Sequence, residues 1–598
     1  MKKNKILSSI TSAILVTSML LTGCGGDETN GSVATSETPT TSETTVASET
    51  GSVEESKLLP ALSADEQGKP GALTLPRSNY VAYPYEDAED IKLTYWLPVP
   101  SSVQQNPKTT DSVQMTQWAQ LWQEMTGIEV EFIGPTSDTA TAFNLMTTST
   151  ELPDIIQWEW VGSYSGGPSA AEDEGVLIYL DEFITPDGPA ADLWQYLQDN
   201  PTIDQMVKTD DGHYYAFPMV RGSKYLNTTS GPIVRKDLIE AVGYKVEDMV
   251  TIDDWTEVMT ALKEYGIEKP LTASNFDNLA TLTLGAYQTR LNMHVDYATG
   301  AMTYGRIEEG YKEWLKQMVA WLDAGLLDAD ILTNNNSARQ ANMLTSKEVS
   351  EKPISAITYG AGGGQIGTWN TAAWSQPDVY GEDYELTGVL FPVLNEDDEV
   401  RYSGGGLEYA TNAYANAVIT ADCEYPEVAA AFLNFCYSMA GHDVINFGIE
   451  GTDYTQNADG TITYSENIMK NPEGLSVAAA MSEKGRANQV GPFVQDPNYI
   501  IGYWATEQQQ RALHAWNDES DAQATLTPAI TLTADEASEY SKIMADIGIA
   551  VKEYYSKVFA GEMDVDSTWD AYVDQLKGMG IESAIAIQQA ALERYNAR

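Results

Sequence analysis

The chain has 598 residues, with 34 Lys and Arg against 87 Asp and Glu, so its formal net charge at pH 7 is −53. Such a charge repels nucleic-acid phosphates, and we therefore exclude a nucleic-acid partner. A wholly disordered acidic chain is also excluded, because 43% of the residues are hydrophobic and the length suffices for more than one domain. The 33 Tyr and 14 Trp against 11 Phe favour rings that tolerate a wet binding site, which points to polar, ring-shaped ligands.

The N-terminus has the pattern of an export signal. A basic start precedes the apolar stretch Ile6–Leu21. The following Leu21-Thr22-Gly23-Cys24 resembles the lipobox of bacterial lipoproteins, in which the chain is cut before the Cys and the new terminal Cys is acylated. We predict a signal peptide at residues 1–23 and lipidation of Cys24, with this lipid as the only membrane anchor.

A flexible tether is expected after the lipid. Gly25–Ser56 contains no Lys or Arg and many Ser and Thr, so it cannot bury enough apolar surface to fold. We assign residues 24–57 to the lipidated Cys and this tether. Of the later cysteines, Cys436 lies within a predicted helix that separates it from Cys423, and we expect two buried free thiols without a disulfide.

Strands and helices alternate in the first part of the folded region. We expect strands at Ile91–Trp96, Ile128–Ile133 and Asp154–Trp158, with helices at Met115–Met125 and Thr141–Thr148. The apolar face of the first helix would comprise Met115, Trp118, Leu121, Trp122 and Met125. This alternation predicts a parallel α/β sheet.

A second α/β lobe is expected further along the chain. A strand at Gly231–Val234 is followed by a capping box at Thr251–Asp254. The apolar residues of 311–322 recur with helical spacing up to Gly325, and we interpret their rings as core. Ala534–Arg598 is predicted to be helical, with a turn at Gly561–Asp566, and to pack across a lobe.

Several segments in order along the chain together resemble one family. They are residues 121–133 (LWQEMTGIEVEFI), 143–156 (FNLMTTSTELPDII), 174–184, 211–218 (DGHYYAFP), 234–262, 311–328, 446–454 (NFGIEGTDY) and 568–595. This order is similar to that of extracellular solute-binding protein family 1, in particular the large lipoproteins of Gram-positive sugar importers, which are distantly similar to maltose-binding protein.

The resemblance implies a two-lobed α/β fold of the periplasmic-binding-protein type II, with crossover strands at a hinge and a C-terminal helical appendage. We expect the crossings near Tyr214–Met219, Leu386–Pro392 and Phe447–Tyr454. The implied limits are residues 58–216 and 390–450 for lobe 1, and residues 217–389 and 451–598 for lobe 2.

The same resemblance implies a binding protein without enzymatic activity or cofactor. It would act as a monomer at the outer face of the cytoplasmic membrane. There it would capture an oligosaccharide in an interlobe cleft and deliver it to the permease subunits of an ABC transporter, closing by hinge motion around the sugar.

A sugar site needs aromatic faces and side chains that donate and accept hydrogen bonds. The first candidates follow the strand that ends in Gln157-Trp158-Glu159-Trp160, since ligands of open α/β sheets bind beyond the carboxyl ends of strands. In maltose-binding protein the matching segment carries a Trp in the sugar cleft, and that Trp falls on Trp158. By the strand-end argument we add Trp96 and Tyr164, and for all three residues plain core packing is the alternative.

Further candidates come from looser matches to the same relative. Trp369 and Trp374 lie where it has a second stacking Trp, and the choice between them stays open. Tyr503 and Trp504 match a third aromatic cluster. Arg221 and Asn227 follow the first crossing and could supply hydrogen bonds, with a surface or capping role as the alternative.

Other motifs favour simpler interpretations. Gly362, Gly364 and Gly367 match G-x-G-x-x-G, but a glycine-rich cleft loop is the simpler interpretation. The segment 455–466 resembles a calcium loop, but its first position is Thr455, and Asp459-Gly460 is typical of a hairpin turn. We predict no metal site.

A tethered glycoside hydrolase is the main alternative function, because such an enzyme needs only two facing carboxylates. A surface adhesion module is the third possible function.

Overall fold

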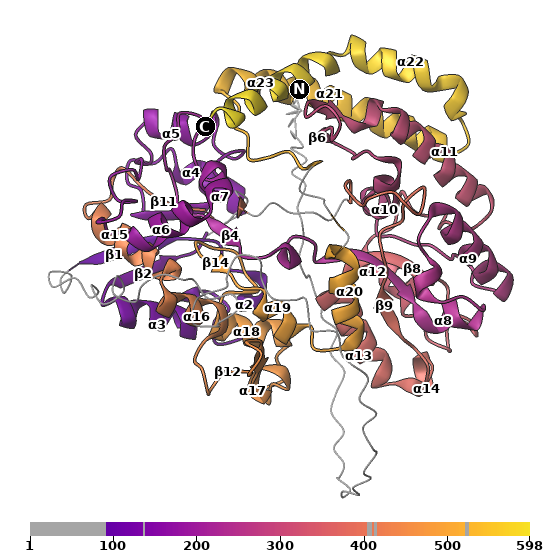
Figure 1. The fold of residues 1–598 in the computed structure, drawn as a ribbon, viewed down its shortest axis with the longest axis horizontal. Coiled ribbons are helices and arrows are strands. Elements are labelled where there is room, and N and C mark those ends of the chain that lie inside the picture. Colours follow the sequence, from indigo (N-terminus) through magenta and orange to yellow (C-terminus); the bar gives the residue numbers. More distant parts are fainter. Residues whose placement is uncertain (1–90, 136–137, 404–409, 412–415, 519, 521–524) are drawn as a thin grey trace, which may run out of the picture. The chain divides into compact units, whose positions relative to one another are not determined.

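The computed structural model describes residues 91–135, 138–403, 410–411, 416–518, 520 and 525–598. The predicted signal peptide, the lipidation site Cys24 and the tether lie outside the described residues. Within the described part, two open sheets carry helices on their faces, and a small third sheet lies in the chain between them (Figure 1).

The sheet of lobe 1 has the strand order β11-β3-β1-β2. Its strands are β1 (Lys92–Trp96), β2 (Glu129–Ile133), β3 (Ile155–Trp158) and β11 (Asn416–Ile419). β1 pairs in parallel with β2 and with β3, which confirms the predicted parallel sheet. β11 was not expected; it runs antiparallel to β3 and returns to this sheet from far along the sequence.

The helices of lobe 1 bury rows of large side chains. They are α3 (Gln117–Thr126), α4 (Thr139–Met146), α5 (Gly167–Asp173), α6 (Ala191–Asp199), α7 (Pro201–Met206), α15 (Pro426–Asn434) and α16 (Met439–Phe447). In α3 the Thr116 side chain caps the first turn and Gly127, at φ 69°, ends the helix as predicted. Met115 was wrongly placed on the buried face, because it lies in the preceding turn and is 60% exposed.

The sheet of lobe 2 has the order β8-β5-β9, in which both neighbours run antiparallel to β5. Its strands are β5 (Ser230–Arg235), β8 (Ile357–Ala361) and β9 (Leu386–Gly388). The helices of this lobe are α8 (Lys236–Ala241), α9 (Ile252–Tyr265), α10 (Phe276–Thr283), α11 (Glu309–Asp323), α12 (Asn336–Met343), α13 (Thr368–Trp374), α14 (Pro377–Tyr380) and α20 (Glu507–Asn517). The capping box of α9 and the buried rings of α11 are confirmed.

The chain passes between the two lobe sheets through a small sheet that we call the hinge sheet, with the order β10-β4-β14. β4 (Met219–Arg221) leads from lobe 1 to β5, β10 (Ala410–Thr411) leads back to β11, and β14 (Val494–Gln495) leads towards α20. The first crossing was thus predicted close to its position.

The other two crossings were wrong. Leu386–Gly388 is the edge strand β9 of lobe 2, and the segment from Phe447 to Tyr454 is the end of α16 and a turn. Two- and three-residue strands carry too little pattern to be recognised in a sequence. The limits of the lobes remain a proposal, with the chain changing lobe at the three strands of the hinge sheet.

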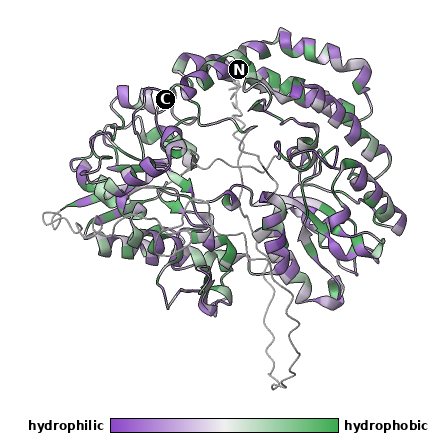
Figure 2. Cartoon of the chain, viewed as in Figure 1, coloured by the Kyte–Doolittle hydropathy of each residue, from purple (hydrophilic) through white to green (hydrophobic). Residues whose placement is uncertain are grey.

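The C-terminal region is helical, as predicted. It consists of α21 (Ala534–Phe559), α22 (Val565–Gly578) and α23 (Ile581–Asn596). Hydrophilic and hydrophobic residues alternate along these helices (Figure 2), and α21 and α22 both pack on α11 of lobe 2. The first half of α23 contributes Ile581 and Ala584 to the core of lobe 2, whereas Leu592 and Tyr595 near its end join the core of lobe 1.

Short elements complete the described part. They are α2 (Ser101–Gln104), β6 (Met293–Val295), β7 (Met302–Tyr304), β12 (Tyr454–Gln456), β13 (Ile462–Tyr464), α17 (Glu466–Met469), α18 (Val477–Lys484), α19 (Asn498–Tyr503) and the single turns η1 (Val113–Met115), η2 (Lys224–Leu226), η3 (Val246–Asp248), η4 (Leu284–Tyr287), η5 (Gly305–Ile307), η6 (Gly362–Gly367) and η7 (Phe435–Tyr437). Both Cys423 and Cys436 are free thiols; Cys436 is buried as expected, whereas Cys423 is only partly buried.

A buried ion pair joins lobe 1 to the segment that follows β14. His442 of α16 places Nδ1 3.1 Å from Asp443 and Nε2 3.3 Å from the buried Asp496. Burial opposes the charge of His442, but the interactions of its ring N–H groups with these two carboxylates outweigh it and raise the pKa of the imidazole from 6.5 to about 9. His442 is therefore charged at neutral pH and neutralises a buried carboxylate.

This pair predicts a pH dependence of stability. A raised pKa in the folded state gives a stabilisation that is fully present below pH 6.5 and is lost as the pH rises through about 9. We expect H442Q to lower the free energy of unfolding by roughly 1 to 3 kcal/mol at pH 6 and by much less above pH 9. Urea unfolding of both proteins at several pH values measures this difference; a difference independent of pH would contradict it.

Candidate functional site

An aromatic cluster lies at the carboxyl ends of the strands of lobe 1. Trp96 is the last residue of β1 and Trp158 the last of β3, and the two strands run side by side. Asn416, the partner of Trp158 across β11, lies five residues after β10 of the hinge sheet. The cluster is therefore at the end of the sheet that is nearest to the hinge, where open α/β sheets bind ligands.

Phe143 of α4 lies at the centre of this cluster. Its ring centroid is 5.9 Å from that of Trp158 and 5.1 Å from that of Trp160, and Trp96 meets Trp158 edge to face at 6.1 Å. The three indoles are buried, with Trp160 completely so, and they support one another. Tyr164, stacked on Trp160 at 6.0 Å, is the more open ring of this group.

Polar groups border the aromatic cluster. The Glu159 carboxylate accepts hydrogen bonds from Gly162 N–H at 2.7 Å and from Ser163 Oγ at 2.8 Å, while burial raises the pKa of Glu159. Tyr164 donates its hydroxyl to Glu174. The Trp160 indole N–H is buried and has no hydrogen-bond partner among the described residues.

A second aromatic cluster lies at the matching end of the lobe 2 sheet. Ser230, the first residue of β5 after the hinge, pairs with Ala361, so the end of β8 is the end nearest to the hinge. η6, the glycine-rich segment that follows, folds as a π-helical turn rather than an open loop. The ring of Trp504 covers it so closely that a Cβ at Gly362 would lie 2.6 Å away.

The remaining aromatic candidates of lobe 2 differ in their environment. Trp369 is buried beside Arg339, whose guanidinium lies 5.5 Å from the ring centroid. Trp374 is 43% exposed and donates its indole N–H to the Tyr384 carbonyl. Tyr503 is half-buried, with its hydroxyl near Gly363. Trp369, Tyr503 and Trp504 thus gather around η6, whereas Trp374 lies one turn further along α13.

The two polar candidates belong to the hinge region. Arg221 is the last residue of β4 and pairs with Gln495 of β14. Asn227 follows the single turn η2, which leads from β4 towards β5. Both side chains are buried, which excludes the surface role, whereas Asn227 is the C-cap residue of η2, in agreement with the capping alternative.

Other readings of the sequence find little support in the described residues. Segment 455–466 contains the hairpin β12–β13, and the Asp459 carboxylate accepts hydrogen bonds from Thr461 across the turn, as the hairpin interpretation predicted. No group of three or more His, Cys, Asp or Glu suited to a metal ion occurs in the described residues. Trp504 covers the glycines of η6, where a dinucleotide phosphate would have to approach.

Sequence reasoning missed several residues that complete the two clusters. They are Phe143, Tyr215, Arg339 and Asn416. Tyr215 lies just before β4, and its hydroxyl accepts a hydrogen bond from Asn416 of the unexpected strand β11. These contacts join residues far apart in the sequence, and no local pattern marks them.

Among the described helices, none has the length and the apolar composition needed to cross a bilayer.

Comparisons with known proteins agree with this architecture. The family model for bacterial extracellular solute-binding proteins matches residues 106–443, more than half of the chain. A Streptococcus pneumoniae relative, the fructooligosaccharide ABC transporter substrate-binding protein FusA, is 21% identical over 502 residues, which cover 79% of this chain and 86% of FusA.

Two solved structures show the same two-lobed fold. The HMO-binding solute-binding protein of Bifidobacterium longum infantis has a TM-score of 0.64 at 16% identity, covering 84% of this chain and 99% of that one. S. pneumoniae FusA in complex with fructo-nystose has a TM-score of 0.59 at 17% identity, covering 85% and 100%.

The packing around η6 gives a testable prediction. In G362A the added methyl group would overlap the Trp504 ring and push it from its place, which we expect to cost about 1 to 3 kcal/mol of stability. In G548A the methyl group enters open space on α21, and a slight stabilisation is expected. Thermal unfolding of the two variants measures the contrast; equal midpoints would contradict the packing.

Proposed function

Because the chain belongs to the family of bacterial extracellular solute-binding proteins, we propose that it captures an oligosaccharide between its two lobes and delivers it to an ABC importer. The observation that carries this proposal is the pair of aromatic clusters, one at the hinge-proximal end of each lobe sheet. Hinge motion would bring the two clusters onto opposite faces of one solute.

The chemistry of both clusters fits a sugar. Half-buried rings such as Tyr164 and Tyr503 offer flat faces for the C–H surfaces of a pyranose or furanose ring. The Glu159 carboxylate and the Tyr164 hydroxyl, which are partly exposed, supply acceptors and donors for hydroxyl groups. FusA and the bifidobacterial protein are named for fructooligosaccharides and HMO respectively, and these ligands support the same class of solute.

The cellular setting follows from the N-terminal sequence and the family. Acylation of Cys24 would hold the protein at the outer face of the cytoplasmic membrane, and the tether would let the lobes move to the permease subunits. We propose that it works there as a monomer, with the permease recognising the closed form.

Glycoside hydrolysis is the alternative that an experiment must separate from transport. Such an enzyme needs two carboxyl groups facing each other across the scissile bond. The carboxylates that border the lobe 1 cluster have other contacts: Glu159 binds the Gly162–Ser163 segment, and Glu174 binds the Tyr164 hydroxyl. This arrangement favours binding without bond cleavage.

Titration calorimetry of the purified chain with kestose, nystose, maltotriose and neutral milk oligosaccharides tests the function, followed by chromatography of the recovered sugars. We expect tight binding of one glycan class and recovery of uncut sugar. Cleaved sugar would instead establish a hydrolase, and absence of heat with every glycan would contradict the assignment of sugar as the solute.

The role of the open ring in lobe 1 gives a second prediction. In Y164A the sugar loses a stacking face, and we expect its affinity to fall about tenfold or more, equivalent to roughly 1.4 kcal/mol. Y265A removes a similarly exposed ring at the end of α9 and serves as the control, with unchanged affinity. Equal affinities of Y164A and the unmodified chain would remove Tyr164 from the site.

A further inference from the structure

Residues 160–167, which we call the Trp160 loop, carry Trp160 and Tyr164 and end where α5 begins. Backbone hydrogen bonds from Tyr164 N–H to the Trp160 carbonyl and from Gly167 N–H to the Tyr164 carbonyl close the loop. Gly166 and Gly167 have φ values of +83° and +70°, a conformation that other residues rarely adopt. The loop therefore has a defined shape, but its own bonds are few.

A segment from the C-terminal region packs against this loop. Residues 529–536, which we call the C-terminal strap, precede and begin α21. A Cβ at Gly167 would lie 2.6 Å from Thr531 Cγ2, and one at Gly166 would lie 3.4 Å from the Ala534 Cβ. The strap thus lies in van der Waals contact with the two glycines, and it leaves no room for a side chain at Gly167.

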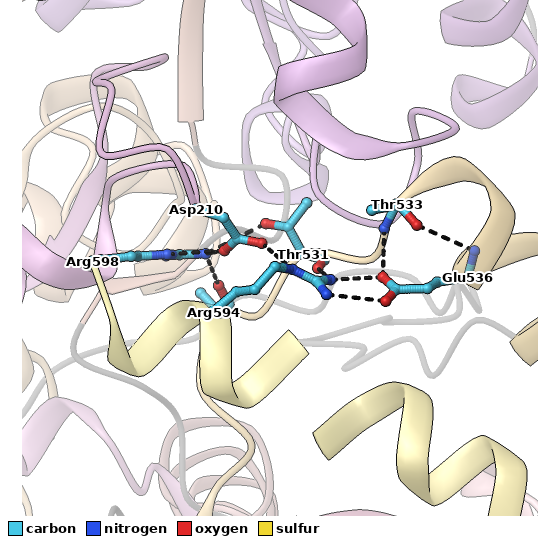
Figure 3. A network of polar contacts seen from close by, with 7 residues as sticks. Asp210, Thr531, Thr533, Glu536, Arg594 and Arg598 are labelled. Atoms are coloured by element: carbon cyan, nitrogen blue, oxygen red, sulfur yellow. Dashed lines mark hydrogen bonds and ion pairs between the residues drawn. The ribbon is translucent and has the colours of Figure 1, made fainter. Parts of the chain in front are cut away.

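Two arginines at the end of the chain hold the strap (Figure 3). Arg594 donates to the Thr531 carbonyl at 2.9 Å and forms a bidentate pair with Glu536 at 3.0 and 2.6 Å. Arg598, whose side chain is 1% exposed, donates to the Ala529 carbonyl at 3.1 Å. Charge-assisted, bidentate bonds of this kind combine strength with a defined geometry.

Asp210 connects the same arginines to lobe 1. Its carboxylate accepts from Arg594 Nε at 2.9 Å and from Arg598 Nη2 at 2.7 Å. Asp210 lies in the turn between α7 and β4, and Gln205 of α7 donates to the Tyr595 carbonyl nearby. Three parts of the sequence, near residues 210, 531 and 596, therefore meet directly behind the Trp160 loop.

We propose that Asp210, Arg594 and Arg598 act through the C-terminal strap as positioning residues for the Trp160 loop of the oligosaccharide site. This inference rests on the proposed function. The three side chains are not proposed to touch the sugar; they hold the strap against Gly166 and Gly167, and the strap in turn holds the loop that presents Tyr164 over the buried Trp160.

The arginine contacts would fix the shape of the Trp160 loop in the free protein as well as in the complex. A loop that is already held in its binding shape pays less conformational entropy when the sugar arrives. Loss of the arginine contacts would release the strap, and the loop would sample shapes that cannot bind. The apparent affinity would fall in proportion to the population of the competent shape.

Hydrogen exchange measured by mass spectrometry tests the support without any ligand. We expect R594Q, and more mildly D210N, to speed amide exchange in peptides covering residues 160–170, while overall unfolding stays cooperative. The matched control is K316Q, which removes an ion pair between α11 and Asp566 of α22 at 3.2 Å, away from the strap. Unchanged exchange in the Trp160 loop of R594Q would overturn the proposal.

Calorimetry with kestose then tests the effect on binding. R594Q should weaken kestose binding about tenfold and K316Q should leave it unchanged. Equal kestose affinity of R594Q and the unmodified chain would overturn the positioning role. If no glycan of the panel binds the unmodified chain, the proposed function fails, and the exchange experiment alone still decides whether the strap supports the loop.

A compensating pair of substitutions tests the contact itself. In G167A the new methyl group overlaps Thr531 Cγ2, and exchange in the Trp160 loop should rise; T531S removes that Cγ2 and should restore part of the protection. The control is G561A, which has nearly the same φ of +71° in open space, so it carries the backbone strain alone. A failure of T531S to restore any protection would show that the strap does not press on the loop.

Discussion

Three short strands carry the chain between the two lobes, and α23 is a further element that packs on both. β4 lies between β10 and β14, and its backbone groups are satisfied partly across the hinge sheet: Val220 N–H donates to the Phe493 carbonyl and Gly222 N–H to the Gln495 carbonyl. A side chain at Gly222 would lie 2.5 Å from that carbonyl, so this close approach requires glycine. Rotation of the lobes about so few residues would change few backbone angles, and α23, whose two ends join different cores, would have to accommodate it.

One side of the hinge is firmly held to lobe 1. Asn446 donates to the Val494 carbonyl at 3.0 Å and Gln495 donates to the Ala487 carbonyl at 2.6 Å. Arg486 is completely buried over the ring of Trp118 and donates to Gln157 of β3 at 3.0 Å. Together with the His442–Asp496 pair, these contacts tie β14 to lobe 1.

The aromatic clusters and the hinge are linked through the chain itself. Trp158 ends the strand next to β11, which follows β10, and η6 follows the strand that pairs with the start of β5. Aromatic side chains at these positions fall into two groups: buried indoles pack at the ends of the sheets, and the tyrosines Tyr164 and Tyr503 stay partly exposed. This division explains why most of the tryptophans expected to bind sugar are buried in the structure.

Local patterns were sufficient for the long elements but not for the contacts that build the site. The parallel strands β1–β3, the capping box of α9 and the core rings of α11 follow from periodicity and capping, which depend on neighbouring residues. The crossings β10 and β14 are two residues long, and the antiparallel β11 is decided by pairing with β3 across more than 250 residues of sequence. Phe143, Asn416 and the strap behind the Trp160 loop are long-range for the same reason.

One sugar that touches both lobes next to the hinge is what the proposed function requires, and a crystal structure of the chain with nystose would reveal it. We predict sugar units in contact with the Trp160 loop of lobe 1 and with the residues around η6, including Tyr503, of lobe 2. Nystose bound to one lobe alone, or bound away from both aromatic clusters, would contradict the account.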